Sequence, residues 1–203
     1  MEGKVKIAMG QMLVEWGKPE ENLSRARNMI REAAEIGCQV IVLPECMDLG
    51  WTYPAKELAQ PIPGRFSDLL CELAREFTIF VVAGLTEQNG DSLYKAAVIV
   101  SDKGEVILQY RKINELDFAL ELYSIGMRVN ATETNFGKVG LAICADLRTE
   151  HSPIGNSLGL MGTRFLLSPS VGWSSQIMII TLTHMVKNGL IPIVKLQRNI
   201  KWL

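Results

Sequence analysis

A chain of 203 residues, 48% of them hydrophobic and 21% charged, is long enough to bury one substantial core and too apolar to stay disordered. Its 21 lysines and arginines oppose 22 aspartates and glutamates, so a net charge of -1 leaves no excess positive charge for a phosphate backbone or an anionic membrane surface. Composition therefore predicts a single globular domain and excludes nucleic acid and membranes as expected partners.

The first half of the chain alternates short apolar runs with amphipathic segments. Residues 5–9 form an apolar run that predicts a strand, and Pro19 with the acidic residues after it favours the first turn of a helix. Apolar residues at three- and four-residue spacing give this helix one buried stripe: Leu23, Ala26, Met29, Ile30 and Ala33. Continuous apolar runs at 40–43 and 79–83 predict buried strands, with a helix over 66–77 between them.

The second half adds a hairpin to this alternation. The β-rich runs 93–100 and 106–110 flank an Asp-Lys-Gly turn, which indicates two antiparallel strands. Residues 139–143 predict another buried strand, 153–161 a short helix and 165–167 a further strand. Helices that alternate with strands, together with a hairpin, predict a layered α/β fold whose sheet faces are covered by helices.

Targeting and metal-binding patterns are absent from the sequence. The first ten residues lack an apolar stretch of signal-peptide length, and no run approaches the roughly 20 apolar residues of a spanning helix, so we expect a cytoplasmic protein. The cysteines and histidines show no spacing typical of zinc sites, so we expect no metal, and free thiols rather than disulfides. These residues are Cys38, Cys46, Cys71, Cys144, His151 and His184.

Three strand ends each carry one reactive side chain. Glu45 follows the run at 40–43, Lys112 follows the hairpin, and Cys144 follows the run at 139–143. A cysteine thiolate is a competent nucleophile, a carboxylate can take its proton and later activate water, and an ammonium group can stabilise an oxyanion. Because active sites of α/β sheets gather at such ends, the three residues together favour acyl transfer through a thioester.

Each of these residues also has a structural interpretation when it is taken alone. A cysteine after an apolar strand is more often a small core residue than a nucleophile. Glu45 could cap the turn that follows it, and Lys112 could be a solvated charge at the end of the hairpin. Only the combination of the three favours catalysis.

That combination resembles the nitrilase superfamily of carbon-nitrogen hydrolases, whose motifs occur here in the family's order. The motifs are Gly10-Gln11, Leu43-Pro44-Glu45, Tyr110-Arg111-Lys112 and Ile143-Cys144-Ala145-Asp146. Supporting features are Ile62-Pro63-Gly64, Ala83-Gly84, Leu-Tyr-Ser-Ile-Gly at 122–126 and Leu-Ser-Pro-Ser at 167–170. The resemblance covers about residues 4–173.

The resemblance implies a role for each motif residue. Glu45 would be the general base, Lys112 the cation that stabilises the oxyanion, Cys144 the nucleophile, and the Ala145 backbone amide a second oxyanion donor. It also implies a four-layer αββα sandwich, dimers or larger assemblies, and no cofactor. The implied substrates are small non-peptide amides, N-carbamoyl compounds or nitriles.

The chain departs from the family's pattern after the lysine. Many members carry a second glutamate seven residues after it, where this chain has Ala119, and a histidine where this chain has Asn114. Glu115 and Glu121 lie nearby, and either could substitute if the loop differs. The sequence favours the alternative, in which both are ordinary surface acids.

A second departure begins after Trp173, where the family's acidic loop and Tyr-Gly-x-x-Trp helix start do not follow. We therefore expect a partial carbon-nitrogen hydrolase domain over residues 1–175, with the sandwich incomplete at its C-terminus. Residues 176–203 are then a non-native tail, explained by a frameshift close to Trp173.

The genetic code makes this frameshift hypothesis specific. In a frame read one nucleotide earlier, Met178 before Ile179 forces an aspartate codon, and Met185 before Val186 forces a glycine codon. The shifted frame can then spell the family's missing Tyr-Gly-x-x-Trp string. A chance match through degenerate codons is the alternative, and the nucleotide sequence of the gene distinguishes the two.

The sequence thus predicts a cysteine-dependent hydrolase of small non-peptide carbon-nitrogen bonds. One alternative is a catalytically inactive remnant of such an enzyme, which Ala119 and the altered C-terminus favour. An acyltransferase would use the same Cys-Glu-Lys site and is not separated from a hydrolase by sequence. A redox-sensing thiol at Cys144 would need a resolving cysteine, and none is evident.

Overall fold

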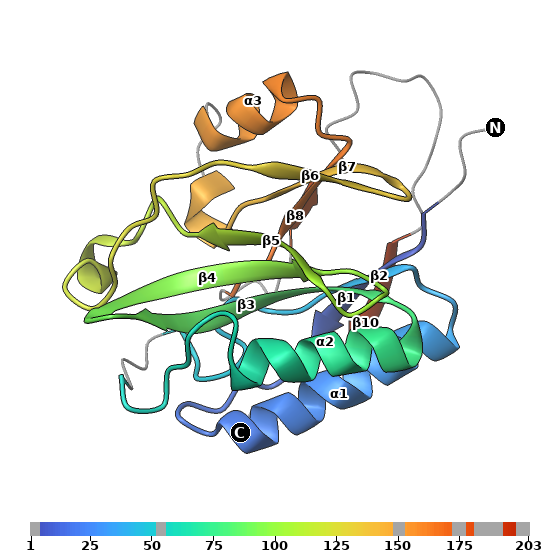
Figure 1. Cartoon of the computed structure of the whole chain (residues 1–203), viewed down its shortest axis with the longest axis horizontal. Coiled ribbons are helices and arrows are strands. Elements are labelled where there is room, and N and C mark those ends of the chain that lie inside the picture. The colour runs from blue at the N-terminus through green and yellow to red at the C-terminus, as the bar shows by residue number, and fades with distance from the viewer. Residues whose placement is uncertain (1–4, 52–55, 148–152, 172–177, 181–192, 198–203) are drawn as a thin grey trace.

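The computed structural model of the protein describes residues 5–51, 56–147, 153–171, 178–180 and 193–197. Two β-sheets stack face to face, with helices α1 and α2 outside the first sheet and α3 outside the second (Figure 1). This arrangement is the predicted four-layer αββα sandwich.

The first sheet has the strand order β10-β1-β2-β3-β4-β5. Its strands are β1 (Ile7–Gln11), β2 (Val40–Val42), β3 (Phe80–Asn89), β4 (Ser92–Val100), β5 (Val106–Arg111) and β10 (Ile193–Gln197). The pairs from β10 to β3 are parallel, whereas β3, β4 and β5 pair antiparallel. The predicted hairpin is therefore confirmed as β4 and β5.

The second sheet has the order β6-β7-β8-β9. Its strands are β6 (Ala131–Thr134), β7 (Gly137–Leu141), β8 (Phe165–Ser168) and β9 (Met178–Ile180). β7 and β8 pair parallel, and the other two pairs are antiparallel. The helices are α1 (Pro19–Glu35), α2 (Arg65–Phe77) and α3 (Pro153–Leu160), with short 3-10 turns η1 (Asp117–Ala119) and η2 (Cys144–Leu147).

Alternation along the central strands separates the core into layers. In β2, Val40 and Val42 point between the two sheets, whereas Ile41 points to the layer under α1 and α2. The stripe of α1 that the sequence predicted packs in that same helix layer, and all five of its residues are buried. On the outer face of the second sheet, Ile154 and Leu158 of α3 pack against Leu166 of β8.

Strand β3 is longer than the apolar run at 79–83 predicted. It continues to Asn89 because Thr86, Glu87, Gln88 and Asn89 pair with residues of β4 across a tight hairpin. These residues are polar, so hydrophobicity alone gives no signal for them, and cross-strand hydrogen bonding extends the strand.

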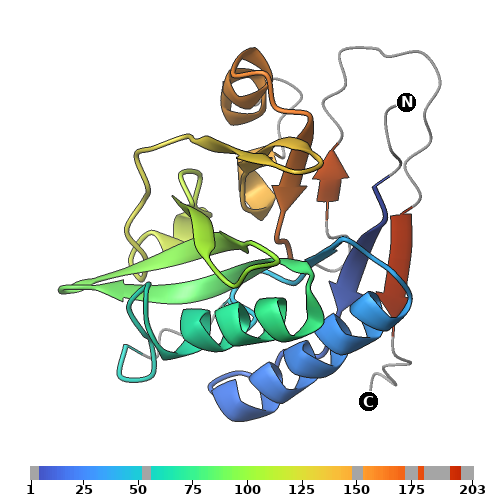
Figure 2. The same ribbon diagram turned by 45° about the vertical axis from the view of Figure 1, so that its right-hand side comes forward.

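Two short strands lie in the segment 176–203, which the sequence analysis predicted to be a non-native tail. β9 pairs with β8, and β10 pairs with β1 at the edge of the first sheet (Figure 2). The remainder of that segment lies outside the described residues. The division of the chain at residue 175 stays a prediction.

Candidate active site

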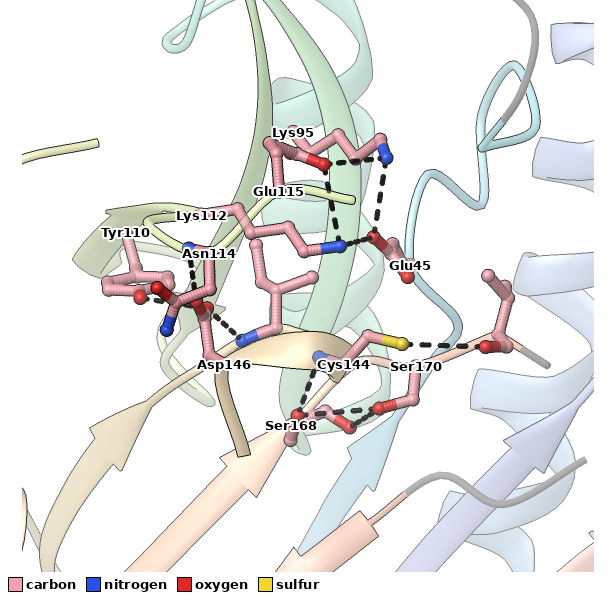
Figure 3. Close-up of polar contacts among 12 residues, drawn as sticks. Glu45, Lys95, Tyr110, Lys112, Asn114, Glu115, Cys144, Asp146, Ser168 and Ser170 are labelled. Atoms are coloured by element: carbon pink, nitrogen blue, oxygen red, sulfur yellow. Dashed lines mark hydrogen bonds and ion pairs between the residues drawn. The ribbon is translucent and has the colours of Figure 1, made fainter. Parts of the chain in front are cut away.

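The three side chains singled out from sequence come from strand ends in both sheets. Glu45 stands in the loop after β2, Lys112 directly follows β5, and Cys144 opens η2 three residues after β7. Figure 3 shows the Cys144 thiol below the Lys112 ammonium and the Glu45 carboxylate. The structure therefore brings the predicted trio into one site.

Glu45 and Lys112 form a buried ion pair. The Lys112 Nζ donates a hydrogen bond of 2.7 Å to Glu45 Oε1, and both side chains are only 2% exposed. Burial acts to lower the pKa of Lys112, but the nearby carboxylates of Glu45 and Glu115 outweigh it and raise the pKa above its ordinary value. Lys112 is thus a fixed cation beside the carboxylate.

Cys144 sits at a sharp turn in the backbone. Its φ of 45° is in the left-handed region that residues other than glycine seldom adopt. Its N–H donates to the Pro169 carbonyl and to Ser168 Oγ, both at 3.2 Å, and its thiol donates to the Val171 carbonyl at 3.5 Å. A negative charge on this sulfur also raises the pKa of Lys112, so the two groups are close enough to interact electrostatically.

Asp146 joins the segment that carries Lys112 to the segment that carries Cys144. Its buried carboxylate accepts hydrogen bonds from the Tyr110 hydroxyl at 2.8 Å, the Asn114 N–H at 2.7 Å and the Ile143 N–H at 2.9 Å (Figure 3). Burial raises the pKa of Asp146 despite these donors, and burial also raises the pKa of Tyr110. The two sheets are therefore braced by one side chain next to the candidate nucleophile.

Replacing Asp146 with alanine is expected to lower the free energy of unfolding by about 2 to 4 kcal/mol, because a buried backbone N–H, a partly buried backbone N–H and a buried hydroxyl lose their acceptor. Tyr110→Phe removes one of the three donors and is expected to cost about 1 to 2 kcal/mol. Urea unfolding measures both. Equal losses for the two variants would contradict the bracing role of the carboxylate.

Glu115 is not the surface acid that the sequence favoured. Its side chain is 0% exposed, and its Oε2 accepts a hydrogen bond of 2.9 Å from the Nζ of Lys95 and lies 3.7 Å from that of Lys112. Glu121, by contrast, is exposed, as expected. A second carboxylate is therefore present in the site, three residues after the lysine.

The loop after β5 explains why spacing alone misplaced this carboxylate. The Gly126 N–H donates to the Lys112 carbonyl at 2.7 Å, so the intervening segment leaves and returns to the same point. Glu115 stays beside Lys112 at the start of this closed loop, whereas Ala119 packs in an apolar cluster with Tyr123. A count of residues along the sequence cannot show this path.

Lys95 is a residue of the site that the sequence analysis missed. It lies on β4 with 1% of its side chain exposed, and its Nζ is 2.9 Å from Glu115 and 4.0 Å from Glu45. The strand carried a signal, because Lys95 lies on the same face of β4 as the buried residues Leu93 and Ala97. A lysine in an apolar register needs a buried partner.

Gly84 of β3 lies against the loop that carries Glu45. A Cβ at this position would come within 2.5 Å of the Glu45 Cα, 2.7 Å of the Pro44 carbonyl oxygen and 2.8 Å of the Cys46 nitrogen. The Gly84 N–H donates to Pro44, and its carbonyl accepts from the Met47 N–H. Only a residue without a side chain permits this contact, which sets the position of Glu45.

Gly84→Ala is expected to push the Glu45 loop away from Lys112 and to lower kcat/KM by roughly 10²-fold, the effect of a displacement of about 1 Å at a catalytic group. Gly90→Ala is the control, because a Cβ there meets nothing within 4 Å and its positive φ of 59° strains only the turn between β3 and β4, away from the Glu45 loop. Steady-state assays of both variants test the expectation. Normal activity in Gly84→Ala would show that the loop can shift without consequence.

Burial disfavours ionisation of the other three cysteines. All four cysteines are free thiols. Burial raises the pKa of Cys38, Cys46 and Cys71, which makes their thiolates scarce. Within the described residues there is no group of three His, Cys, Asp or Glu side chains that could hold a metal ion, and no helix long and apolar enough to cross a membrane.

Comparison with known proteins gives a consistent family. The sequence model of the carbon-nitrogen hydrolases matches residues 6–190. A nitrilase of Pyrococcus abyssi is 36% identical over 174 residues, which cover 82% of this chain and 64% of the relative. Omega-amidase NIT2-A of Xenopus laevis is 34% identical over 157 residues, covering 71% and 56%. The chain thus spans 56% to 64% of the length of these two curated relatives.

Solved structures show the same fold. A mutant of the amidase from Nesterenkonia sp. AN1, with acrylamide added at its active-site cysteine, superposes with a TM-score of 0.72 at 19% identity. That match covers 81% of this chain and 66% of the amidase. Nit3 of Saccharomyces cerevisiae gives a TM-score of 0.73 at 25% identity, with coverage of 83% and 65%.

Proposed function

Because the chain belongs to the carbon-nitrogen hydrolase family, we propose that it hydrolyses a small non-peptide amide through a thioester on Cys144. N-carbamoyl compounds and nitriles are further substrates of the same chemistry. The observation that carries the proposal is the buried Glu45–Lys112 ion pair of 2.7 Å beside Cys144. It supplies a base and a cation next to a nucleophile.

Acylation begins when Glu45 accepts the proton of the Cys144 thiol. The sulfur attacks the amide carbon and the carbonyl oxygen becomes an oxyanion, which the Lys112 ammonium and the Ala145 backbone N–H stabilise. Ala145 directly follows Cys144 within η2, so its backbone N–H is the next one along the chain after the nucleophile. Collapse of the intermediate breaks the C–N bond, and the proton held by Glu45 passes to the departing ammonia or amine.

In deacylation, water is the nucleophile and Glu45 is again the base. Glu45, again a carboxylate, takes a proton from water, and the resulting hydroxide attacks the thioester carbon. The same donors stabilise the second oxyanion. The C–S bond then breaks, the acid product leaves, and the proton returns to the sulfur of Cys144.

Glu115 supplies a place for the nitrogen of the substrate. Within the described part of the chain, its Oε1 is buried without a hydrogen-bond partner, although Oε2 is held by Lys95. A buried oxygen without a hydrogen-bond partner favours the binding of a ligand that carries a hydrogen-bond donor. An amide N–H₂ group is such a donor, so we assign Glu115 to orient the leaving nitrogen.

Amides are the preferred substrates because the relatives include proteins described as omega-amidases and an amidase. Ammonia release from a panel of short amides, N-carbamoyl amino acids and nitriles tests the proposal with the chain as it exists. Saturable release from at least one amide is expected. No release from any member of the panel by the folded chain would contradict it.

A further inference from the structure

The site contains four buried charges rather than the two expected of an ion pair. Glu45, Glu115, Lys95 and Lys112 have side chains exposed by 2% or less. Lys112 lies 2.7 Å from Glu45 and 3.7 Å from Glu115, and Lys95 lies 2.9 Å from Glu115 and 4.0 Å from Glu45. Figure 3 shows the four groups as a closed ring of contacts.

Charge balance shows what Lys95 contributes to this ring. Without it, Lys112 alone would face two buried carboxylates, and one negative charge would stay uncompensated in a medium that solvates it poorly. Two carboxylates in that situation favour the protonation of one of them. A protonated Glu45 could not accept the thiol proton of Cys144.

The position of Lys95 is set by contacts beyond the ring. Its ammonium lies 4.8 Å from the centre of the Tyr123 ring and 5.8 Å from that of the Trp51 ring, within the range of cation–π attraction. Its backbone carbonyl accepts the Lys112 N–H at 2.9 Å. Lys95 is therefore held at a fixed place relative to Lys112 by its main chain as well as its side chain.

We propose that Lys95 is a positioning residue, which holds Glu115 beside Lys112 and keeps Glu45 available as the base for Cys144. This inference rests on the proposed hydrolase function and adds to it a residue that touches neither the nucleophile nor the reacting carbon. Besides its four members, the titratable groups that interact with the ring are Cys46, Tyr123, Cys144 and Asp146, and Asp48 lies beside Cys46 and Tyr123.

The test is the pH dependence of Cys144 alkylation by acrylamide, followed by mass spectrometry of the peptide that contains Cys144. This measurement requires no turnover. In Lys95→Met, the midpoint of the alkylation profile is expected to move up by roughly one pH unit, because a neighbouring positive charge is lost. Lys95→Arg keeps the charge and is expected to stay close to the midpoint of the unmodified chain.

A second pair of variants tests the same proposal if the single variant Lys95→Met fails to fold. Glu115→Gln leaves Lys95 as excess positive charge and is expected to lower the midpoint, whereas Lys95→Met with Glu115→Gln is neutral and is expected to return it. Identical midpoints in Glu115→Gln and in the double variant would overturn the proposal, as would an unshifted midpoint in folded Lys95→Met.

Ammonia release separates this inference from the proposed function. If the chain hydrolyses an amide, the acid limb of its kcat/KM profile is expected to move up in Lys95→Met by the same roughly one unit as the alkylation midpoint. Shifted alkylation without any hydrolysis would support the role of Lys95 and contradict the hydrolase. Hydrolysis with unshifted alkylation would contradict the role of Lys95 alone.

Discussion

Replacing Cys144 with alanine is expected to reduce ammonia release by at least about 10⁴-fold, because the thioester can no longer form. Alanine removes only the sulfur, and the backbone hydrogen bonds of Cys144 to Pro169 and Ser168 are preserved. The free energy of unfolding should therefore change little. Initial rates of ammonia release and a thermal unfolding curve measure the two effects separately.

Cys71→Ala is the matched control for this variant. Cys71 is a free thiol on α2, outside the site, and is partly exposed like Cys144. Its replacement is expected to leave ammonia release unchanged. A Cys144→Ala variant that retains a tenth or more of the rate would exclude Cys144 as the nucleophile.

Glu45→Gln is expected to have the second largest effect, a fall in kcat of about 10² to 10⁴-fold. The glutamine amide oxygen can still accept the 2.7 Å hydrogen bond from Lys112, so the side chain is expected to keep its position. An amide cannot take the proton of the Cys144 thiol or of water. Because the lost interaction acts in the transition state, kcat should fall far more than KM rises.

Glu121→Gln makes the same chemical change at an exposed position of the nearby loop and is expected to leave kcat unaltered. Steady-state kinetics at several pH values compares the two variants. If Glu45→Gln turned over within a factor of ten of the unmodified chain, another group would have to be the base.

The layered α/β fold could be inferred from the strand pattern, and the trio from its positions at strand ends together with the motifs that resemble the nitrilase superfamily. Continuous apolar runs such as 40–43 and 139–143 are typical of strands covered on both faces, and the structure places β2 and β7 in the interior of the sandwich. Side chains that follow such strands gather at the same edge. Glu45, Lys112 and Cys144 therefore meet even though they come from two sheets.

The second half of the site could not be inferred because it depends on the path of a loop. Glu115 reaches Lys112 through a segment closed by the Gly126–Lys112 hydrogen bond, and no periodicity reports such a closure. Lys95 was missed for a different reason. The apolar register of β4 indicates that this lysine is buried, but the sequence does not identify Glu115 as its partner.

The roles assigned to Glu45, Lys112, Cys144 and Ala145 share one intermediate, an acyl group on the sulfur of Cys144. Acid quenching during turnover of the amide that releases ammonia fastest, followed by mass spectrometry of the peptide with Cys144, detects it directly. The account predicts a mass increase equal to the acyl group of that amide, on Cys144 alone, and its absence from Cys144→Ala. Turnover without any adduct on Cys144, together with unchanged turnover in Cys144→Ala, would contradict it.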